Sequence, residues 1–284
     1  MRKILYILLI MCTAACEEAV LPTTGNSGNV TLRFTPSVQD VTRGNTDLGS
    51  YFTKLNVMLF DAVGNKVWDK VRTQLSTDDS FGTLTASLAP DTYTIVAVGH
   101  SSAVSATIKS TDMVQFTARD GEKLTDTFCY CGTLTIGDSP EQYSLTMHRA
   151  GAMFRLVMTD ASMPAFSSLR LDYTGGSANF NPQTLEGNTK STQSETRAFS
   201  EAGQYVAFTF PYMGTSCNIN MKLSALTADG SVIHSLTLSD VLMTRNRITT
   251  YSGEFFGAGQ WTVTQTAFTF TVNGDWDGED HYTF

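Results

Sequence analysis

The chain has 284 residues, 42% of them hydrophobic and 11% aromatic, which is enough for one large domain or two of modest size with buried cores. It carries 27 acidic and 19 basic side chains, a formal net charge of -8 at pH 7. A nucleic-acid-binding surface needs clustered basic residues to neutralise phosphates, so we do not expect nucleic acid as a partner.

The N-terminus predicts a secretory signal peptide over residues 1–15. Arg2 and Lys3 form a positive region, and an apolar run follows over residues 4–11. This run is about half the length of the ~20 residues that a membrane-spanning helix needs, so it is typical of a signal peptide rather than of a membrane span.

The residues after the apolar run predict a lipid anchor. Small residues at 13–15 precede Cys16, which resembles a bacterial lipobox, although threonine replaces the leucine usual three residues before the cysteine. We expect Cys16 to be lipidated and to start the mature chain, because each buried CH₂ of an acyl chain adds roughly 0.8 kcal/mol of membrane affinity. The alternative is an ordinary secreted protein with a chance cysteine. Glu17 and Glu18 resemble the export signal of Bacteroidetes-type outer-membrane lipoproteins, and the inner leaflet stays open as a destination.

Residues 16–29 are polar and contain glycine and proline, which predicts a tether between the lipid and the fold. From residue 30 the apolar residues recur with a period of two, the pattern of half-buried strands, and no helical periodicity follows the signal peptide. The predicted strands are residues 30–34, 55–59, 93–98, 153–158, 169–173, 205–210, 219–226, 232–238 and 268–272. We therefore predict an all-β protein built from antiparallel β-sandwiches.

A proline-containing acidic stretch over residues 136–143 predicts a linker. The resulting division is an N-terminal sandwich over residues 30–143 and a C-terminal sandwich over residues 144–284, the latter ending in a tail strand within about 261–284. Each unit has the usual size of one sandwich domain.

Ser101, in the run Gly-His-Ser-Ser-Ala at the end of a predicted strand, raises the question of a hydrolase nucleophile. A nucleophile elbow requires a helix directly after the serine and a second glycine, but Ala103 replaces that glycine and a β-like segment follows. We predict that the protein is not an enzyme and has no catalytic residue.

The cysteines and the acidic tail give no cofactor prediction. Cys129, Cys131 and Cys217 are too few and too close for a zinc site, although one of the first two could pair with Cys217. Residues 273–278 match the first six positions of a calcium-binding loop, but Phe284 stands where the bidentate glutamate is required. We expect no metal and no cofactor; a weak calcium site and a solvated acidic turn both stay open for this segment.

Five short motifs, taken together, resemble one known family. They are residues 55–61 followed by Gly64, residues 88–99, residues 145–156, residues 246–249 and residues 272–276. Their order and spacing resemble the fimbrillin superfamily of Bacteroidetes-type fimbriae, most closely the FimB-type anchor and assembly lipoproteins. Asp91 occupies a position where the family usually has glycine.

The resemblance implies transthyretin-like sandwiches and a lipid-anchored fimbrial subunit on the outer membrane and cell surface, with an anchor, accessory or tip role in adhesion. Its partners would be other fimbrial subunits that assemble by strand addition, in which backbone hydrogen bonds supply affinity. Phe268, Phe270 and Val272 share one face of the tail strand and are the candidate donor residues. Alternatively, this strand completes its own sandwich.

In stalk members of the family, cleavage after an arginine removes the leader and the first strand. Arg43 is the candidate for such a leader-cleavage site, and an uncut Arg43 would indicate an anchor or accessory subunit. The competing hypothesis is an outer-membrane lipoprotein that binds glycans or another host surface through aromatic residues such as Tyr212, Trp261 and Trp276.

Overall fold

The computed structural model describes residues 29–37, 48–116, 124–199, 203–257, 264–265 and 278–283. The regular elements in these segments are strands, apart from one turn of 3₁₀ helix at Leu48–Ser50. The prediction of an all-β protein is confirmed. The described residues contain no helix long and apolar enough to cross a membrane.

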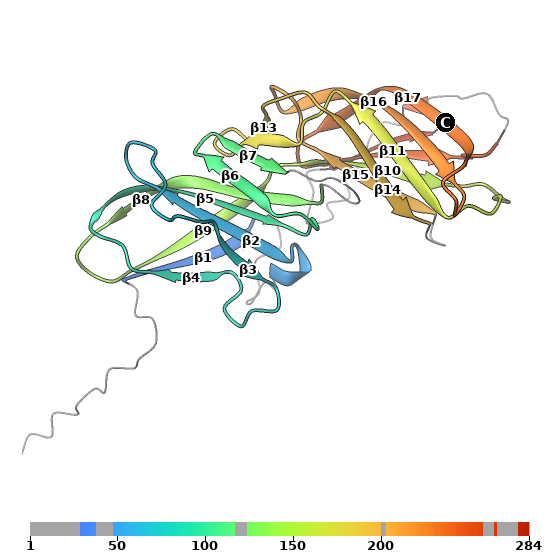
Figure 1. Ribbon diagram of the computed structural model, residues 1–284. Coiled ribbons are helices and arrows are strands. Elements are labelled where there is room, and N and C mark those ends of the chain that lie inside the picture. The colour runs from blue at the N-terminus through green and yellow to red at the C-terminus, as the bar shows by residue number, and fades with distance from the viewer. Residues whose placement is uncertain are drawn as a thin grey trace, which may run out of the picture.

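The first half of the molecule is a sandwich whose two layers meet at one corner (Figure 1). In spatial order its strands are β3 (Arg72–Leu75), β2 (Lys54–Phe60), β5 (Asp91–His100), β8 (Thr127–Ile136), β9 (Glu141–Arg149), β1 (Val30–Pro36) and β4 (Thr83–Ala86). The corner is the short β8–β9 contact, where Phe128 pairs with Arg149 and Cys129 with His148. Side chains from both layers enclose one apolar core.

The second half is a sandwich of two separate sheets. The first sheet has the order β15 (Gln204–Thr209), β10 (Ala152–Met158), β18 (Arg247–Gly253), β20 (Gly278–Thr283) and β19 (Thr264–Gln265). The second has the order β14 (Thr192–Ala198), β11 (Ser168–Thr174), β16 (Ser216–Leu226) and β17 (Val232–Thr244).

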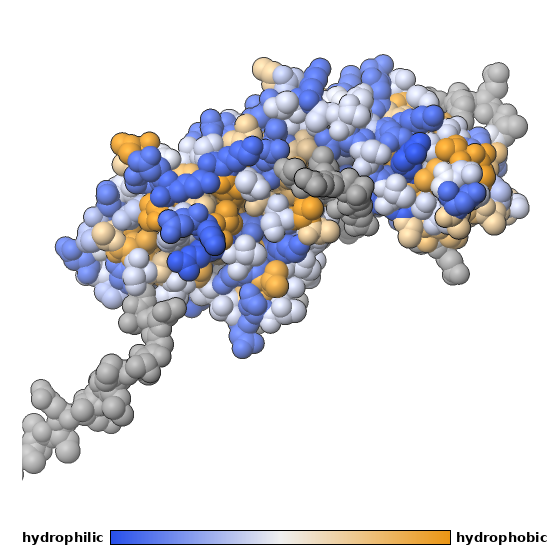
Figure 2. All heavy atoms as spheres, viewed as in Figure 1, coloured by the Kyte–Doolittle hydropathy of each residue, from blue (hydrophilic) through white to orange (hydrophobic). Residues whose placement is uncertain are grey.

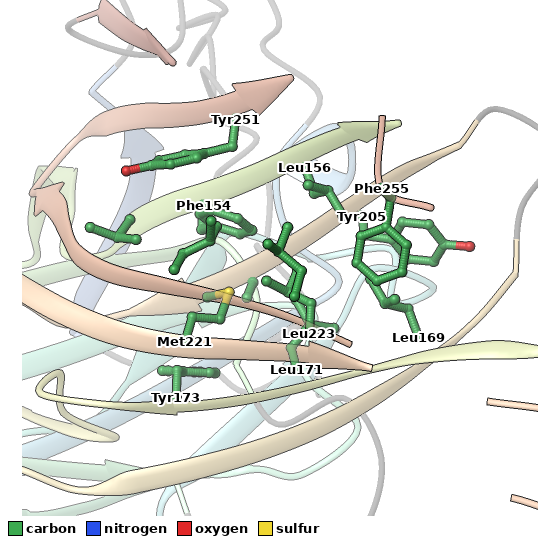
Figure 3. Close-up of a cluster of buried hydrophobic side chains, with 14 of the residues drawn as sticks. Phe154, Leu156, Leu169, Leu171, Tyr173, Tyr205, Met221, Leu223, Tyr251 and Phe255 are labelled. Atoms are coloured by element: carbon green, nitrogen blue, oxygen red, sulfur yellow. The ribbon is translucent and has the colours of Figure 1, made fainter. Parts of the chain in front are cut away.

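Apolar residues from both sheets of the second half fill its core (Figure 3). Phe154 and Leu156 of β10 and Leu171 of β11 are fully buried, since alternate residues of a strand face the same side. On the outside, Figure 2 shows apolar areas interrupted by hydrophilic ones across the visible face. The period-two pattern of the sequence therefore sorts apolar side chains into the cores.

A fourth, small sheet crosses from one half to the other. Its order is β13 (Glu186–Gly187), β12 (Asn179–Asn181), β7 (Met113–Phe116) and β6 (Ala106–Ser110). Strands β6 and β7 belong to the first half of the chain and β12 and β13 to the second, and the two pairs join where Phe180 lies opposite Val114. This small sheet ties the halves together with backbone hydrogen bonds.

Two details differ from the sequence-based picture. Strand β9 begins at Glu141, so the expected boundary between residues 143 and 144 falls inside a strand of the first half, and the halves meet after Arg149. In addition, three strand pairs are parallel rather than antiparallel: β1 with β9, β10 with β18, and β18 with β20.

Candidate functional site

The predicted functional positions lie outside the described residues. They are the lipidation site Cys16, the leader-cleavage candidate Arg43 and the donor-strand residues Phe268, Phe270 and Val272. The calcium-like segment 273–278 is described only at its last residue, Gly278, which opens β20.

Ser101 and His100 form no nucleophile–base pair. Ser101 is exposed, and its Oγ accepts a hydrogen bond from the backbone N–H of Thr53 at 3.1 Å. The preceding His100 is fully buried at the end of β5. Strand β5 ends at His100, and the structure records no hydrogen bond between the imidazole and the Ser101 hydroxyl.

The His100 ring is a structural group. Its Nε2 lies 2.8 Å from Asn56 Oδ1, and its Nδ1 accepts a hydrogen bond from the backbone N–H of Ser102 at 3.2 Å. The backbone N–H of Ala106 also points to Nε2, at 3.3 Å, so the ring connects β2 to the backbone that follows β5. Burial, with a further effect of the nearby Lys54 charge, lowers the pKa of His100 to about 3.

The three described cysteines are free thiols. Burial raises the pKa of Cys129 well above its usual value and that of Cys131 to about 11, and it also raises the pKa of Cys217. A protonated thiol is a poor nucleophile and a poor metal ligand. Within the described segments, no three metal-binding side chains gather into one group.

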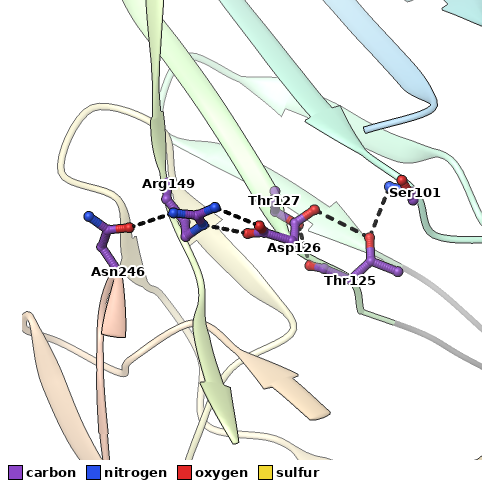
Figure 4. A network of polar contacts seen from close by, with 6 residues as sticks. All are labelled: Ser101, Thr125, Asp126, Thr127, Arg149 and Asn246. Atoms are coloured by element: carbon purple, nitrogen blue, oxygen red, sulfur yellow. Dashed lines mark hydrogen bonds and ion pairs between the residues drawn. The ribbon is translucent and has the colours of Figure 1, made fainter. Parts of the chain in front are cut away.

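The junction between the halves holds a buried polar cluster, drawn in Figure 4. Arg149, at the end of β9, donates two hydrogen bonds of 2.8 Å to the two carboxylate oxygens of Asp126. Its remaining terminal nitrogen donates to Asn246 Oδ1 in the second half at 2.9 Å. The guanidinium also lies 4.5 Å from the centre of the Phe128 ring. One nearly buried cation thus contacts both halves.

Aromatic packing forms a second contact across the junction. Phe116 of β7 stacks on Phe210 of the second half, with the ring centres 6.0 Å apart, and Phe180 lies 4.5 Å from the same Phe210 ring. These rings belong to an apolar cluster that also includes Val96 and Val98 on the outer face of β5. The junction is therefore a core of its own, shared by both halves.

Glu195 on β14 forms a third contact. Its buried carboxylate accepts hydrogen bonds from the Tyr173 hydroxyl, from Arg197 and from the backbone of Leu124 in the first half. Burial raises the pKa of Glu195, against the lowering effects of Arg197 and of these hydrogen bonds. The carboxylate joins an N-terminal loop to the second sandwich.

Sequence motifs identified two of the junction residues. Arg149 lies in the motif at residues 145–156 and Asn246 begins the motif at residues 246–249, and the structure brings the two into direct contact. Asp126 and Glu195 were missed, because each is a single carboxylate in a polar stretch with no pattern that marks it as buried.

One family model matches most of the chain. The profile of the family described as "Fimbrillin-A associated anchor proteins Mfa1 and Mfa2" matches residues 16–282. No curated protein matches the chain.

Several solved structures match part of the chain at low sequence identity. The fimbrial anchor protein Mfa2 from Porphyromonas gingivalis is 10% identical, with a TM-score of 0.41 over 74% of this chain and 82% of that one. The tip fimbrial protein Mfa3 from the same organism is 11% identical, with a TM-score of 0.40 over 75% and 92%. A candidate adhesin from Bacteroides thetaiotaomicron is 16% identical, with a TM-score of 0.45 over 73% and 79%.

Proposed function

Because the chain belongs to the family of fimbrillin-A associated anchor proteins Mfa1 and Mfa2, we propose that this fimbrial subunit is lipid-anchored in the outer membrane through Cys16. It acts as an anchor or accessory subunit at the cell surface and supports adhesion through the fimbrium that it helps to assemble.

The observation that carries this proposal is the extent of the family match. It runs from residue 16 to residue 282, so it begins at the predicted lipidated cysteine and includes the tether and both halves. A short apolar signal followed by small residues and a cysteine supplies the anchor independently of the family match.

Within this function we propose that Arg43 stays uncut. Strand β1 precedes Arg43 and lies between β4 and β9, with Val30, Leu32 and Phe34 buried. Cleavage after Arg43 would separate this strand from the rest of the chain. A subunit that must stay attached to its lipid needs β1 and the body of the protein in one polypeptide.

We further propose that the fimbrial partner binds by strand addition, with Phe268, Phe270 and Val272 as the contributed apolar face. Support comes from the flanking strands: β19 precedes this segment and is the edge strand of the five-stranded sheet, and β20 follows the segment and pairs with β19. Backbone hydrogen bonds at such an edge would give affinity, and alternate side chains would give specificity.

The first experiment is the mass of the N-terminal peptide of the protein isolated from the producing cell. We expect a lipidated Cys16 on the intact chain, and loss of both lipid and outer-membrane fractionation in Cys16→Ser. Arg43→Ala is the control: its N-terminal peptide should stay lipidated and its chain intact, with only the mass difference of the substitution. A native N-terminus at Gly44 would overturn the anchor role and indicate a processed stalk subunit.

A deletion strain separates this function from glycan capture. Loss or shedding of fimbriae with unchanged growth on glycans supports the fimbrial role. Normal fimbriae together with impaired growth on a glycan would contradict it and identify a glycan-binding lipoprotein.

A further inference from the structure

Strands β1 and β9 form a parallel ladder that joins the N-terminal end of the fold to the junction. The register runs from Val30 opposite Glu141 to Pro36 opposite Met147. The ladder is closed at both ends by backbone hydrogen bonds, from Glu141 N–H to Asn29 O at 2.8 Å and from Ser37 N–H to Met147 O at 2.6 Å.

The two ends of this ladder connect to different parts of the molecule. Val30, where the chain enters the fold from the predicted tether, lies beside the start of β9. The far end of β9 is Arg149, and the chain passes from there directly into β10 of the second half. Tension between the tether and the second half would therefore pull β1 and β9 in opposite directions along their common axis.

We propose that the β1–β9 ladder is a force-bearing shear clamp between the membrane anchor and the body of the subunit. This inference rests on the proposed lipid anchor at Cys16. When two parallel strands are pulled along their axes from opposite ends, the evenly spaced hydrogen bonds share the load and must break together. When both strands are pulled from the same end, the bonds break one after another at lower force.

The surroundings of β1 strengthen the clamp. Val30, Leu32 and Phe34 are at most 2% exposed, so sliding β1 would drag three apolar side chains through the core of the first half. On its other side β1 pairs with β4, with Phe34 N–H donating to Gly82 O at 2.9 Å. Tension on β1 must therefore break both the β1–β9 and the β1–β4 ladder and disturb the core of the first half.

The contacts at the junction transmit the force from the end of β9 to the second half. The Arg149 guanidinium binds Asp126 in the first half and Asn246 in the second, so the end of β9 is fixed to both. The β7–β12 pairing and the shared aromatic cluster add further connections between the halves. Force that reaches the end of β9 is distributed over the second sandwich instead of one peptide segment.

Single-molecule force spectroscopy on the chain beginning at residue 16 tests the clamp. One handle is attached at the N-terminus, and the second through a clickable residue at Ala228, in the exposed turn between β16 and β17. In the matched construction the second handle is at Asp138, in the exposed turn before β9, on the same side of the ladder as Val30. We expect a severalfold higher rupture force for the Ala228 geometry, because only that geometry loads the ladder in shear. Equal forces would overturn the proposal.

A variant pair tests whether the ladder hydrogen bonds carry the force. Along β1 the backbone N–H groups of even-numbered residues point toward β4, as that of Phe34 does, and those of odd-numbered residues point toward β9, as that of Ser37 does. The backbone N–H of Arg33 is therefore directed toward β9. Arg33→Pro removes this N–H, whereas Arg33→Ala removes only an exposed side chain. We expect Arg33→Pro to lower the shear force severalfold and Arg33→Ala to leave it unchanged.

Equal shear forces in the two variants would contradict the inference. The comparison of pulling directions needs no strand variant, so it decides the question even if Arg33→Pro does not fold. Both measurements are independent of lipidation, and a failed clamp is thus distinguished from a failed anchor, which the N-terminal mass reports.

Discussion

At the scale of single residues, the buried polar groups hold positions that the apolar pattern alone does not determine. His100 ends the longest apolar run of the first half, and its neutral ring links Asn56 on β2 to the loop that follows β5. A buried polar group is stable only when its hydrogen-bonding atoms have partners, and both ring nitrogens meet that condition here.

The low pKa of His100 predicts acid sensitivity. The folded state binds fewer protons than the unfolded state, so the stability is complete above the usual pKa of 6.5 and falls as the pH drops toward about 3. Over this pH range the free energy of unfolding falls by on the order of 4 kcal/mol. Urea unfolding followed from pH 7 to pH 4 should show a shallower decline for His100→Gln than for the parent chain; parallel curves would contradict this reading.

Arg149 should be the most sensitive charged position of the junction. Only 2% of its side chain is exposed, and its loss leaves the carboxylate of Asp126 without a bidentate partner. We expect Arg149→Met to lower the free energy of unfolding by about 3 kcal/mol, and Asp126→Asn in the same chain to restore part of that loss. Chemical denaturation of both single variants and the double variant measures the coupling. Strictly additive losses would show that the pair does not act as a unit.

At the scale of strands, the elements predicted between residues 30 and 238 are confirmed, but others were missed, including the long strands β8 and β9. Each predicted strand from residue 30 to residue 238 lies within a strand of the structure or overlaps one, because its side chains alternate between a core and solvent. Strand β5 is buried on both faces, since Ile95 enters the sandwich core and Val96 enters the junction cluster, which explains its continuous apolar run.

Strands β12 and β20 escaped prediction because their pairing depends on distant partners. Strand β12 has three residues and pairs with β7 from the other half, so no local pattern could reveal it. Strand β20 follows the acidic segment and contains Asp280 and His281, which made it look like a loop. It is held by tertiary contacts instead: Tyr282 stacks on Tyr251 at 4.8 Å, and Asp280 pairs with Arg247.

Substitutions at successive residues of β20 should therefore differ sharply in their effect on stability. Tyr282 faces the core of the second half, whereas His281 is exposed on the opposite face of the strand. We expect Tyr282→Ala to cost about 2 kcal/mol and His281→Ala less than about 0.5 kcal/mol. Thermal unfolding of the two variants compares them, and equal losses would mean that β20 is not packed by this face.

At the scale of the whole molecule, the two halves share too many contacts to unfold as independent domains. The sequence correctly indicates two sandwiches, but it could not reveal the third core between them, because the contributing residues come from segments far apart along the chain. Cooperative unfolding follows when the same side chains stabilise both parts.

Phe210 tests this cooperativity, since its ring contacts Phe116 in the first half and Phe180 in the second. We expect Phe210→Ala to lower the stability of the chain by about 4 kcal/mol and to shift both halves together. Leu223→Ala, in the core of the second half alone, is the matched control for a buried large-to-small change. Hydrogen exchange at increasing denaturant reports the two halves separately; protection lost from one half only in Phe210→Ala would contradict a single unit.

The small sheet across the junction also has a consequence for how the protein is made. The chain is synthesised from its N-terminus, so β7 is complete before its partner β12 has been made. Until β12 arrives, β7 offers an unpaired edge and Phe116 lacks the Phe210 ring that covers it. The first half is therefore exposed to wrong pairing until β12 has been made, and chaperones that bind unpaired edges would protect it during that interval.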